Sequence, residues 1–179
     1  MPNHEAQKIN LSRASLGSPP AQMKQFEFLM GNWNVAIKNY QPDGTVESEE
    51  KGTWSAECRN GGRMVFDEFT RISSSGEETS YAITLRTFCP ETDQWEMTFL
   101  FSLQQDHPQF FRGKFVEGEG RFEAVIDLTS ERSIPTKIRF FDIRDDRFEW
   151  TMKHSVDDGK TWFLGEHISA TRASLRQPL

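Results

Sequence analysis

Large apolar side chains recur at every second position in several separate stretches of this chain. These stretches run through Trp95, Met97, Phe99, Phe101 and Leu103, through Phe122, Ala124, Ile126 and Leu128, and through Phe148, Trp150 and Met152. Because successive side chains of a β-strand point to opposite faces, each stretch predicts a strand with one buried and one solvent-exposed face. This alternation is typical of antiparallel sheets, whereas parallel sheets covered on both faces show continuous apolar runs.

Turn-forming sequences separate the stretches at short, fairly regular intervals. Glycine, proline, asparagine and aspartate gather at residues 42–44, 60–62, 73–76, 89–93, 118–120, 144–146 and 157–159, as in hairpin connections. We predict about ten strands in up-and-down order, at residues 32–40, 45–58, 63–72, 79–88, 94–103, 110–117, 121–129, 135–143, 147–155 and 161–173. Closing such a sheet pairs its two edge strands with each other. The predicted fold class is therefore all-β, a single closed antiparallel barrel.

The remaining segments fit one barrel domain in a chain of 179 residues. Residues 1–20 are polar and end in Gly17-Ser18-Pro19-Pro20, which predicts a flexible leader. Residues 23–30 predict a short helix, because two prolines precede them and Gly31 follows. We assign the barrel to residues 21–175 and a tail to 176–179.

The predicted helix leads into Gly31-Asn32-Trp33 at the start of the first strand, and Arg172 lies in the last strand. This arrangement resembles the lipocalin and wider calycin families. The segments 26–33, 90–95 and 158–162 look like those of uncharacterised bacterial lipocalin-like families. The resemblance implies that Trp33 plugs the closed end beside the helix and that Arg172 packs across its indole. It also implies binding of a small apolar or amphipathic molecule.

Two features of secreted lipocalins, a signal peptide and disulfides, are not visible in this sequence. In this respect the chain resembles intracellular calycins, such as fatty-acid-binding proteins and the heme-binding nitrobindins, more than secreted lipocalins. The N-terminus lacks the basic and then apolar order of a secretion signal, so we expect a cytoplasmic protein. Cys58 and Cys89 have no CxxC spacing, and we expect them to be reduced structural thiols.

Assumed turn lengths then predict which side chains face the interior. A three-residue loop at 157–159 pairs His154 with Trp162, Met152 with Leu164 and Trp150 with Glu166. A two-residue turn at 43–44 sets Trp33 opposite Trp54 and Ile37 opposite Glu50. With alternation along each strand, the predicted inward aromatic residues are Trp54, Phe66, Phe99, Phe122, Phe140, Trp150 and Trp162. The predicted inward polar residues are Glu50, Glu68, Asp142, His154 and Glu166.

We expect an internal pocket at the end of the barrel away from Trp33. Its predicted lining is Glu166, Trp150, Phe140, Phe99, Phe66, Phe122, His154 and Glu68. A carboxylate in apolar surroundings is costly unless it is paired or neutralised. Glu166 is therefore expected to orient a ligand or to transfer a proton, with an ion pair to a buried arginine such as Arg86 as the structural alternative.

Three classes of function follow from this pattern. Binding of a small apolar or amphipathic molecule ranks first, because the strong features build a cavity and none builds a reaction centre. The second is a lipocalin-like isomerase, cyclase, hydratase or decarboxylase that uses an internal Glu or His for acid–base chemistry. The third is a structural barrel filled by its own side chains.

Cofactor and partner expectations are few. No cofactor and no metal site are expected, and heme is the alternative through His167, which the register turns outward unless a bulge at Gly165 reverses it. The formal net charge of -6 and a pI near 5.3 disfavour nucleic-acid and anionic-membrane partners. A small molecule is the expected partner, and a homodimer is left open.

Overall fold

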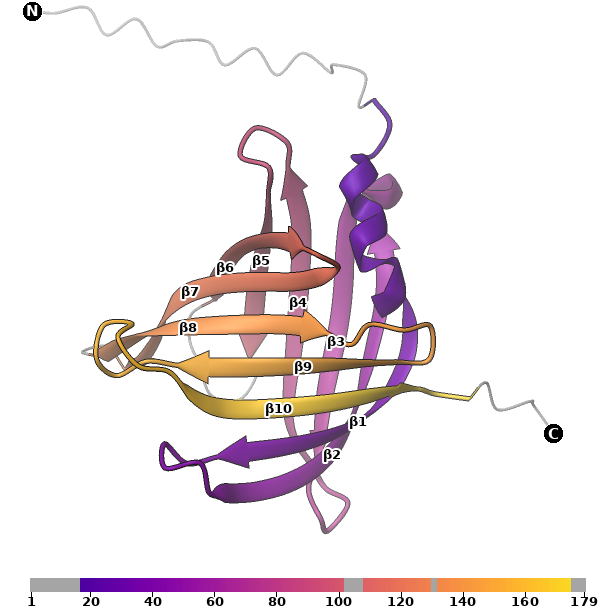
Figure 1. Ribbon diagram of the computed structural model, residues 1–179. Coiled ribbons are helices and arrows are strands. Elements are labelled where there is room, and N and C mark those ends of the chain that lie inside the picture. Colours follow the sequence, from indigo (N-terminus) through magenta and orange to yellow (C-terminus); the bar gives the residue numbers. More distant parts are fainter. Residues whose placement is uncertain (1–16, 102–107, 130–131, 175–179) are drawn as a thin grey trace, which may run out of the picture.

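The computed structural model describes residues 17–101, 108–129 and 132–174 (Figure 1). Within these ranges ten antiparallel strands form a closed barrel, which confirms the predicted all-β class. The strands are β1 (Gly31–Tyr40), β2 (Val46–Arg59), β3 (Met64–Ile72), β4 (Glu78–Cys89), β5 (Gln94–Phe101), β6 (Gln109–Val116), β7 (Glu119–Thr129), β8 (Arg132–Phe141), β9 (Arg147–His154) and β10 (Phe163–Arg172). The predicted tail and most of the predicted leader lie outside the described residues.

Each strand pairs with its neighbours in sequence, and β1 pairs with β10 to close the barrel. The closing ladder runs from Trp33 opposite Arg172 to Asn39 opposite Glu166. The β1–β2 register is the predicted one, with Trp33 opposite Trp54 and Ile37 opposite Glu50. Closure leaves neither terminal strand with a free edge. The sequence predicted closure for this reason, since it pairs the two edge strands with each other.

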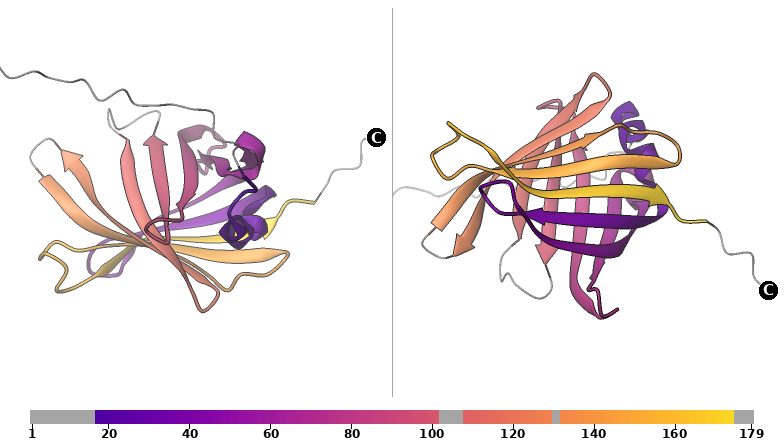
Figure 2. Two further views of the ribbon diagram at one scale, coloured as in Figure 1. Left: turned by 90° about the horizontal axis from the view of Figure 1, so that it is seen from above. Right: turned by 60° about the horizontal axis from the view of Figure 1, so that its bottom comes forward.

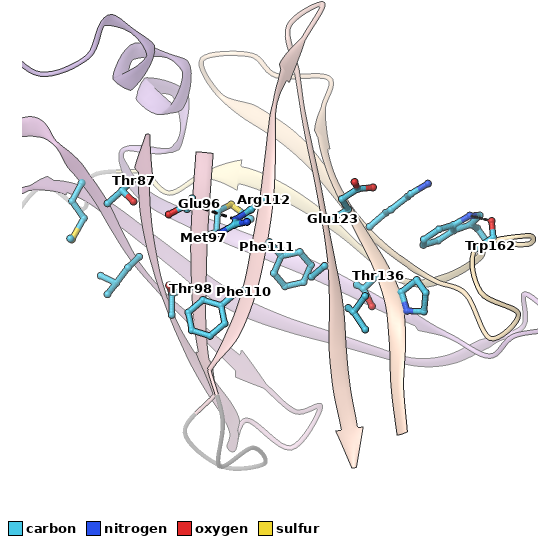
Figure 3. Close-up of a pocket in the computed structure, with 17 residues that line it drawn as sticks. Thr87, Glu96, Met97, Thr98, Phe110, Phe111, Arg112, Glu123, Thr136 and Trp162 are labelled. Atoms are coloured by element: carbon cyan, nitrogen blue, oxygen red, sulfur yellow. Dashed lines mark hydrogen bonds and ion pairs between the residues drawn. The ribbon is translucent and has the colours of Figure 1, made fainter. Parts of the chain in front are cut away.

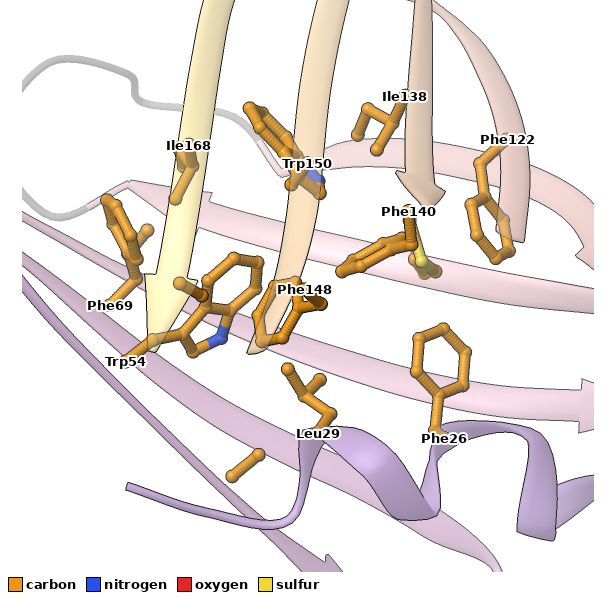
Figure 4. Packing of buried hydrophobic residues seen from close by; sticks show 14 of the residues in the cluster. Phe26, Leu29, Trp54, Phe69, Phe122, Ile138, Phe140, Phe148, Trp150 and Ile168 are labelled. Carbon is orange, nitrogen blue, oxygen red and sulfur yellow. The ribbon is translucent and has the colours of Figure 1, made fainter. Parts of the chain in front are cut away.

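A 3-10 helix, η1 (Ala21–Leu29), occupies the place of the predicted short helix and covers one end of the barrel (Figures 1 and 2). A second short turn of 3-10 helix, η2 (Asn60–Gly62), joins β2 to β3. The apolar side of η1 buries Met23, Phe26 and Leu29. Phe26 meets the rings of Trp95 and Phe140 edge to face, at centroid distances of 4.8 and 5.7 Å (Figure 4). The helix therefore fills this end of the barrel with side chains.

The prediction of which β3 side chains face the interior was wrong, because the strand is shifted by one residue in register. Val65, Asp67 and Phe69 face the interior, whereas Phe66 is half-buried on the outer face and Glu68 is exposed. The β2–β3 ladder places Trp54 opposite Phe69 and so sets this parity. Apolar residues occupy both faces of β3, so alternation alone favoured the wrong face. A shift of one residue turns every side chain of a strand to the other side.

The β9–β10 hairpin also differs from its predicted register. Its loop is longer than three residues, so His154 lies opposite Phe163, and a bulge between Leu164 and Glu166 shifts the pairing again. The two differences cancel, and Glu166 still faces the interior, opposite Met152 instead of Trp150. Trp162 does not face inward. Its ring packs beneath Lys137, a residue of the outer face, with the ammonium nitrogen 4.0 Å from the ring centroid.

The ladder between β6 and β7 is short. Their pairing ends at Arg112 opposite Glu123, and beyond this point the strands diverge toward the end away from η1 (Figure 2, left). The side-chain oxygen of Gln109 accepts a hydrogen bond from the backbone N–H of Asp127, at 3.3 Å. This contact links the two strands where their backbones no longer pair.

Candidate functional site

An internal cavity of about 250 Å³ lies in the half of the barrel away from η1. Inward side chains from β2 to β10 surround it. Its aromatic and aliphatic lining is Trp54, Phe69, Ala82, Phe99, Phe101, Phe111, Ile126, Ile138, Trp150, Met152 and Ile168, and its polar lining is Asp67, Arg71, Ser80, Thr84, Gln109, His154 and Glu166. Apolar walls with a few polar groups are typical of small-molecule sites.

The predicted lining residues divide into three groups. Glu166, Trp150, Phe99 and His154 line the cavity. Phe122 and Phe140 point inward but are buried in the packed half, where both rings contact Phe26 (Figure 4). Phe66 and Glu68 belong to the outer face of β3, as described above. Asp142, also expected inside, lies in the β8–β9 turn and forms ion pairs with two arginines there.

Trp33 and Arg172 form the expected stack at the helix end. The guanidinium carbon of Arg172 lies 4.0 Å from the ring centroid of Trp33. Its three nitrogens donate hydrogen bonds to the backbone oxygens of Phe28, Met30 and Asp145, at 2.7 to 3.0 Å. One arginine thus ties η1 to β1, β10 and the β8–β9 turn, and it combines cation–π attraction with charge-assisted hydrogen bonds.

A polar cluster, here called the Arg71 cluster, lies on four adjacent strands, on the side of the cavity away from η1. It consists of Asn39 on β1, Glu50 on β2, Arg71 on β3 and Glu166 on β10. The Arg71 guanidinium forms a close ion pair with Glu166 and a longer one with Glu50, at 3.6 Å. It also donates a hydrogen bond to Asn39, at 3.5 Å. The cluster holds two carboxylates against one guanidinium.

Burial raises the pKa of Glu166, while the positive charge of Arg71 acts in the opposite direction. The structural alternative considered for Glu166 is therefore present, but its partner is Arg71 and not Arg86. A second hollow of about 320 Å³ adjoins the cluster and shares Arg71, Ser80 and Phe101 with the cavity wall. The Arg71 cluster thus lies between the apolar interior and this outer vestibule.

His154 lies on the cavity wall near the end of β9. Its Nδ1 is 2.9 Å from the hydroxyl of Thr136, and burial lowers its pKa, so the imidazole is neutral at pH 7. Gly165, at the β10 bulge, leaves room for this ring, because a Cβ atom there would lie 2.6 Å from the His154 Cδ2. The bulge that keeps Glu166 inward is therefore also the place where the backbone approaches His154.

A buried ion pair separates the cavity from the packed end. Arg86 and Asp67 are both fully buried and in contact, and Asp67 also accepts a hydrogen bond from the Trp54 indole, at 2.8 Å. The guanidinium lies 5.1 Å from the Phe26 ring centroid. Burial lowers the pKa of Arg86 to about 9, so it keeps its charge at neutral pH. Asp67 supplies the opposite charge that a buried guanidinium requires.

A larger hollow of about 1040 Å³ lies on the outside of the barrel, over β4 to β8 (Figure 3). Outward residues such as Phe110 and Val125, both about two-thirds exposed, form much of its wall. Glu96 and Arg112 form a surface ion pair in it, at 3.2 Å. The hollow is broad, and mostly outward side chains form it, so the smaller cavity inside the barrel, lined by buried apolar side chains, is the stronger candidate for a binding site.

His167, the candidate heme ligand, is on the outer face. Its Nε2 lies 2.8 Å from Glu149, and its ring stacks on Phe141. Among the described residues no group of three or more His, Cys, Asp or Glu side chains could hold a metal ion. Cys58 and Cys89 are both free thiols. None of the described helices is long and apolar enough to cross a membrane.

Sequence reasoning missed Asp67 and Arg71 as site residues, because the wrong parity of β3 placed them outside. The sequence signal nearest to them is Asn60-Gly61-Gly62 in the β2–β3 connection, whose residues all have positive φ angles and form a tight turn, but the length of the connection decides the parity of β3. The connection spans four residues, 60–63, so Arg59 lies opposite Met64 and Ala56 opposite Asp67. A three-residue connection at 60–62 would instead set Ala56 opposite Phe66, which is the parity that was predicted.

No family profile and no curated relative matches the sequence, but the fold matches solved structures. Rv2717c from M. tuberculosis superposes with a TM-score of 0.62 at 10% identity, over 88% of this chain and 100% of that one. The S-type phycobiliprotein lyase CPES from Guillardia theta gives 0.57 at 10% identity, over 87% and 99%. At this identity the likeness concerns the fold alone. With ten strands closed in chain order in the described residues, the helix over one end and the Trp33–Arg172 stack, the fold is a lipocalin-like barrel.

Proposed function

We propose that this protein binds a small apolar or amphipathic molecule in the inner cavity. The observation that carries the proposal is the cavity itself: a space of about 250 Å³ inside the barrel, partly open to solvent, with aromatic walls and a polar cluster on one side. An apolar cavity of about 150 Å³ can hold benzene. The cavity therefore has room for a molecule of one or two rings, with a polar end toward the Arg71 cluster.

The other functions considered have less support in the geometry. A barrel completely filled by side chains does not fit the cavity half, although it describes the helix end well. A catalytic role would need Glu166 or His154 for proton transfer, but Arg71 already holds Glu166, and Thr136 lies against Nδ1 of His154. The two free cysteines fit the reducing, cytoplasmic setting that we propose for the protein.

A variant that fills the cavity tests the proposal. Ala82 on β4 is buried on the cavity wall, so Ala82→Phe should occupy the space. Ala36 on β1 is exposed on the outer face, so Ala36→Phe is the matched control. Native mass spectrometry of freshly purified protein should detect a bound small molecule in the wild type and in Ala36→Phe, and titration calorimetry should show that both bind the apolar probe tetralin. Ala82→Phe should lose both.

The indole N–H signals in a nitrogen–proton NMR spectrum give a second measurement that needs no variant at the cavity. Tetralin should shift the signals of Trp54 and Trp150, which line the cavity, and leave that of Trp162, which lies outside. The proposal is wrong if the wild type carries no co-purified molecule and binds no tetralin.

A further inference from the structure

The five tryptophans of the chain differ in how their indole N–H groups are used. Four of them donate to a protein oxygen at 2.8 to 3.0 Å: Trp33 to Leu29, Trp54 to Asp67, Trp95 to Gln25 and Trp162 to Gly159. Trp150 is buried, with 4% of its surface exposed, and its Nε1 has no hydrogen-bond partner among the described residues. A buried donor without an acceptor is destabilising, so such a group calls for a specific explanation.

The surroundings of Trp150 explain why the protein offers no acceptor. Its neighbours across the sheet are Phe140 on β8 and Ile168 on β10. Phe148 and Met152 precede and follow it on the same face of β9. All four side chains lack a strong acceptor, and the indole of Trp54 meets Trp150 edge to face, at a centroid distance of 6.5 Å (Figure 4). The cavity lies beside the ring of Trp150, while the Nε1 atom itself is closed off by its neighbours, so an acceptor in the cavity reaches it after a small shift of the ring.

Other buried polar atoms without hydrogen bonds have ionic partners. Asp67 and Arg86 neutralise each other, and Glu50 lies 3.6 Å from Arg71. Trp150 is uncharged and has no such compensation. It is therefore a buried donor beside the cavity for which the described residues offer no acceptor.

We propose that the ligand of this cavity carries a hydrogen-bond acceptor, such as a carbonyl oxygen, within its apolar part, and that this atom accepts the N–H of Trp150. This inference rests on the proposed binding function and narrows it to a compact ring compound with an oxygen inside the barrel. An acceptor at this place orients the molecule, because the rest of the wall around Trp150 is apolar. A hydrocarbon of the same shape would leave the donor unpaired.

A pair of probes with nearly the same shape tests the inference. 1-Tetralone has a carbonyl oxygen where tetralin has two hydrogens, and titration calorimetry gives the affinity of each. In Trp150→Phe a smaller aromatic ring remains and the donor is lost. We expect this variant to reduce the ratio of tetralone to tetralin affinity about threefold to tenfold, as for one hydrogen bond. The ratio is the quantity to compare, because the smaller ring changes the packing around both probes alike.

Trp54→Phe is the matched control, because Trp54 lines the same cavity but already donates to Asp67. It should leave the affinity ratio unchanged. If Trp150→Phe does not fold, the indole signal of Trp150 in the wild type gives the answer: with tetralone bound it should lie downfield of its position with tetralin bound. An unchanged ratio together with the same Trp150 signal position for both bound probes would overturn the acceptor proposal while the binding function stands. Failure of both probes to bind would instead overturn the binding function, and this inference with it.

Discussion

The two halves of the barrel use the same kinds of aromatic residue with opposite results. At the helix end Phe26, Phe140 and Phe148 are fully buried and pack ring against ring, with centroid distances from 5.7 to 6.0 Å. At the other end Trp150 and Phe99 surround a cavity of about 250 Å³. The number of inward aromatic residues therefore does not decide whether a barrel is filled.

The difference comes from an element outside the sheet. A barrel of ten strands is wider than the eight-stranded kind whose own side chains can just fill it. At one end η1 adds Met23, Phe26 and Leu29 to the interior. No helix adds side chains at the cavity end in the described part of the chain, and Ala82 contributes only a methyl group to the wall there. The helix thus makes the stable, packed half, and its absence from the other half leaves a site.

The strongest test of this contrast is Trp33→Ala at the packed end. Trp33 is almost fully buried under Arg172, so its loss should lower the free energy of unfolding by about 3–5 kcal/mol. Trp162→Ala is the comparison, because that ring lies on the outside against Lys137 and should cost about 1 kcal/mol. Urea denaturation measures both. Equal losses would mean that Trp33 does not have the structural role proposed for it.

The boundary between the halves should be sensitive to charge. Asp67→Ala leaves Arg86 buried without its counter-ion, so stability should fall by about 3 kcal/mol. Replacing both residues by apolar ones, Asp67→Leu with Arg86→Met, should recover part of this loss. Glu119→Ala, which breaks a surface cluster with Arg121 and Arg139, should have a much smaller effect. If the double variant is less stable than Asp67→Ala, the pair contributes more than mutual neutralisation.

The smallest expected effect is a dependence of stability on pH at the cavity end. Burial lowers the pKa of His154 below its ordinary 6.5, so the unfolded chain binds a proton more readily than the folded one. The stabilisation is complete above about pH 6.5 and is lost as the pH falls through the lower, folded-state pKa. His154→Gln should flatten the decrease in melting temperature between pH 7 and pH 5. His167→Gln, on the outer face, should retain it, and a flattening in both variants would argue against burial as the cause.

The strand order could be predicted because it depends on features local to the sequence, and closure followed from pairing the two edge strands. The Trp33–Arg172 contact is not local and was predicted from the family resemblance. Alternation identifies a strand, and turn residues identify its ends. Glu166 shows the limit of this reasoning, since its inward direction was predicted from a loop length that was too short and a bulge that was left out. The two errors cancelled. For Phe66, Glu68 and Trp162 no second error cancelled the error in register, and their predicted inward directions were wrong.

By itself, the amino-acid sequence determined that this chain forms an antiparallel β-barrel with a helix at its Trp33 end, because side-chain period and turn chemistry act over a few residues. Tertiary structure decided which face of β3 is buried, that Asp67 neutralises Arg86, that Arg71 holds Glu166, and that a cavity remains beside Trp150. These features depend on register across strands and on the volume that η1 fills. A shift of one residue in a ladder reverses both faces of a strand, so the contacts that make the site become definite only when the barrel closes.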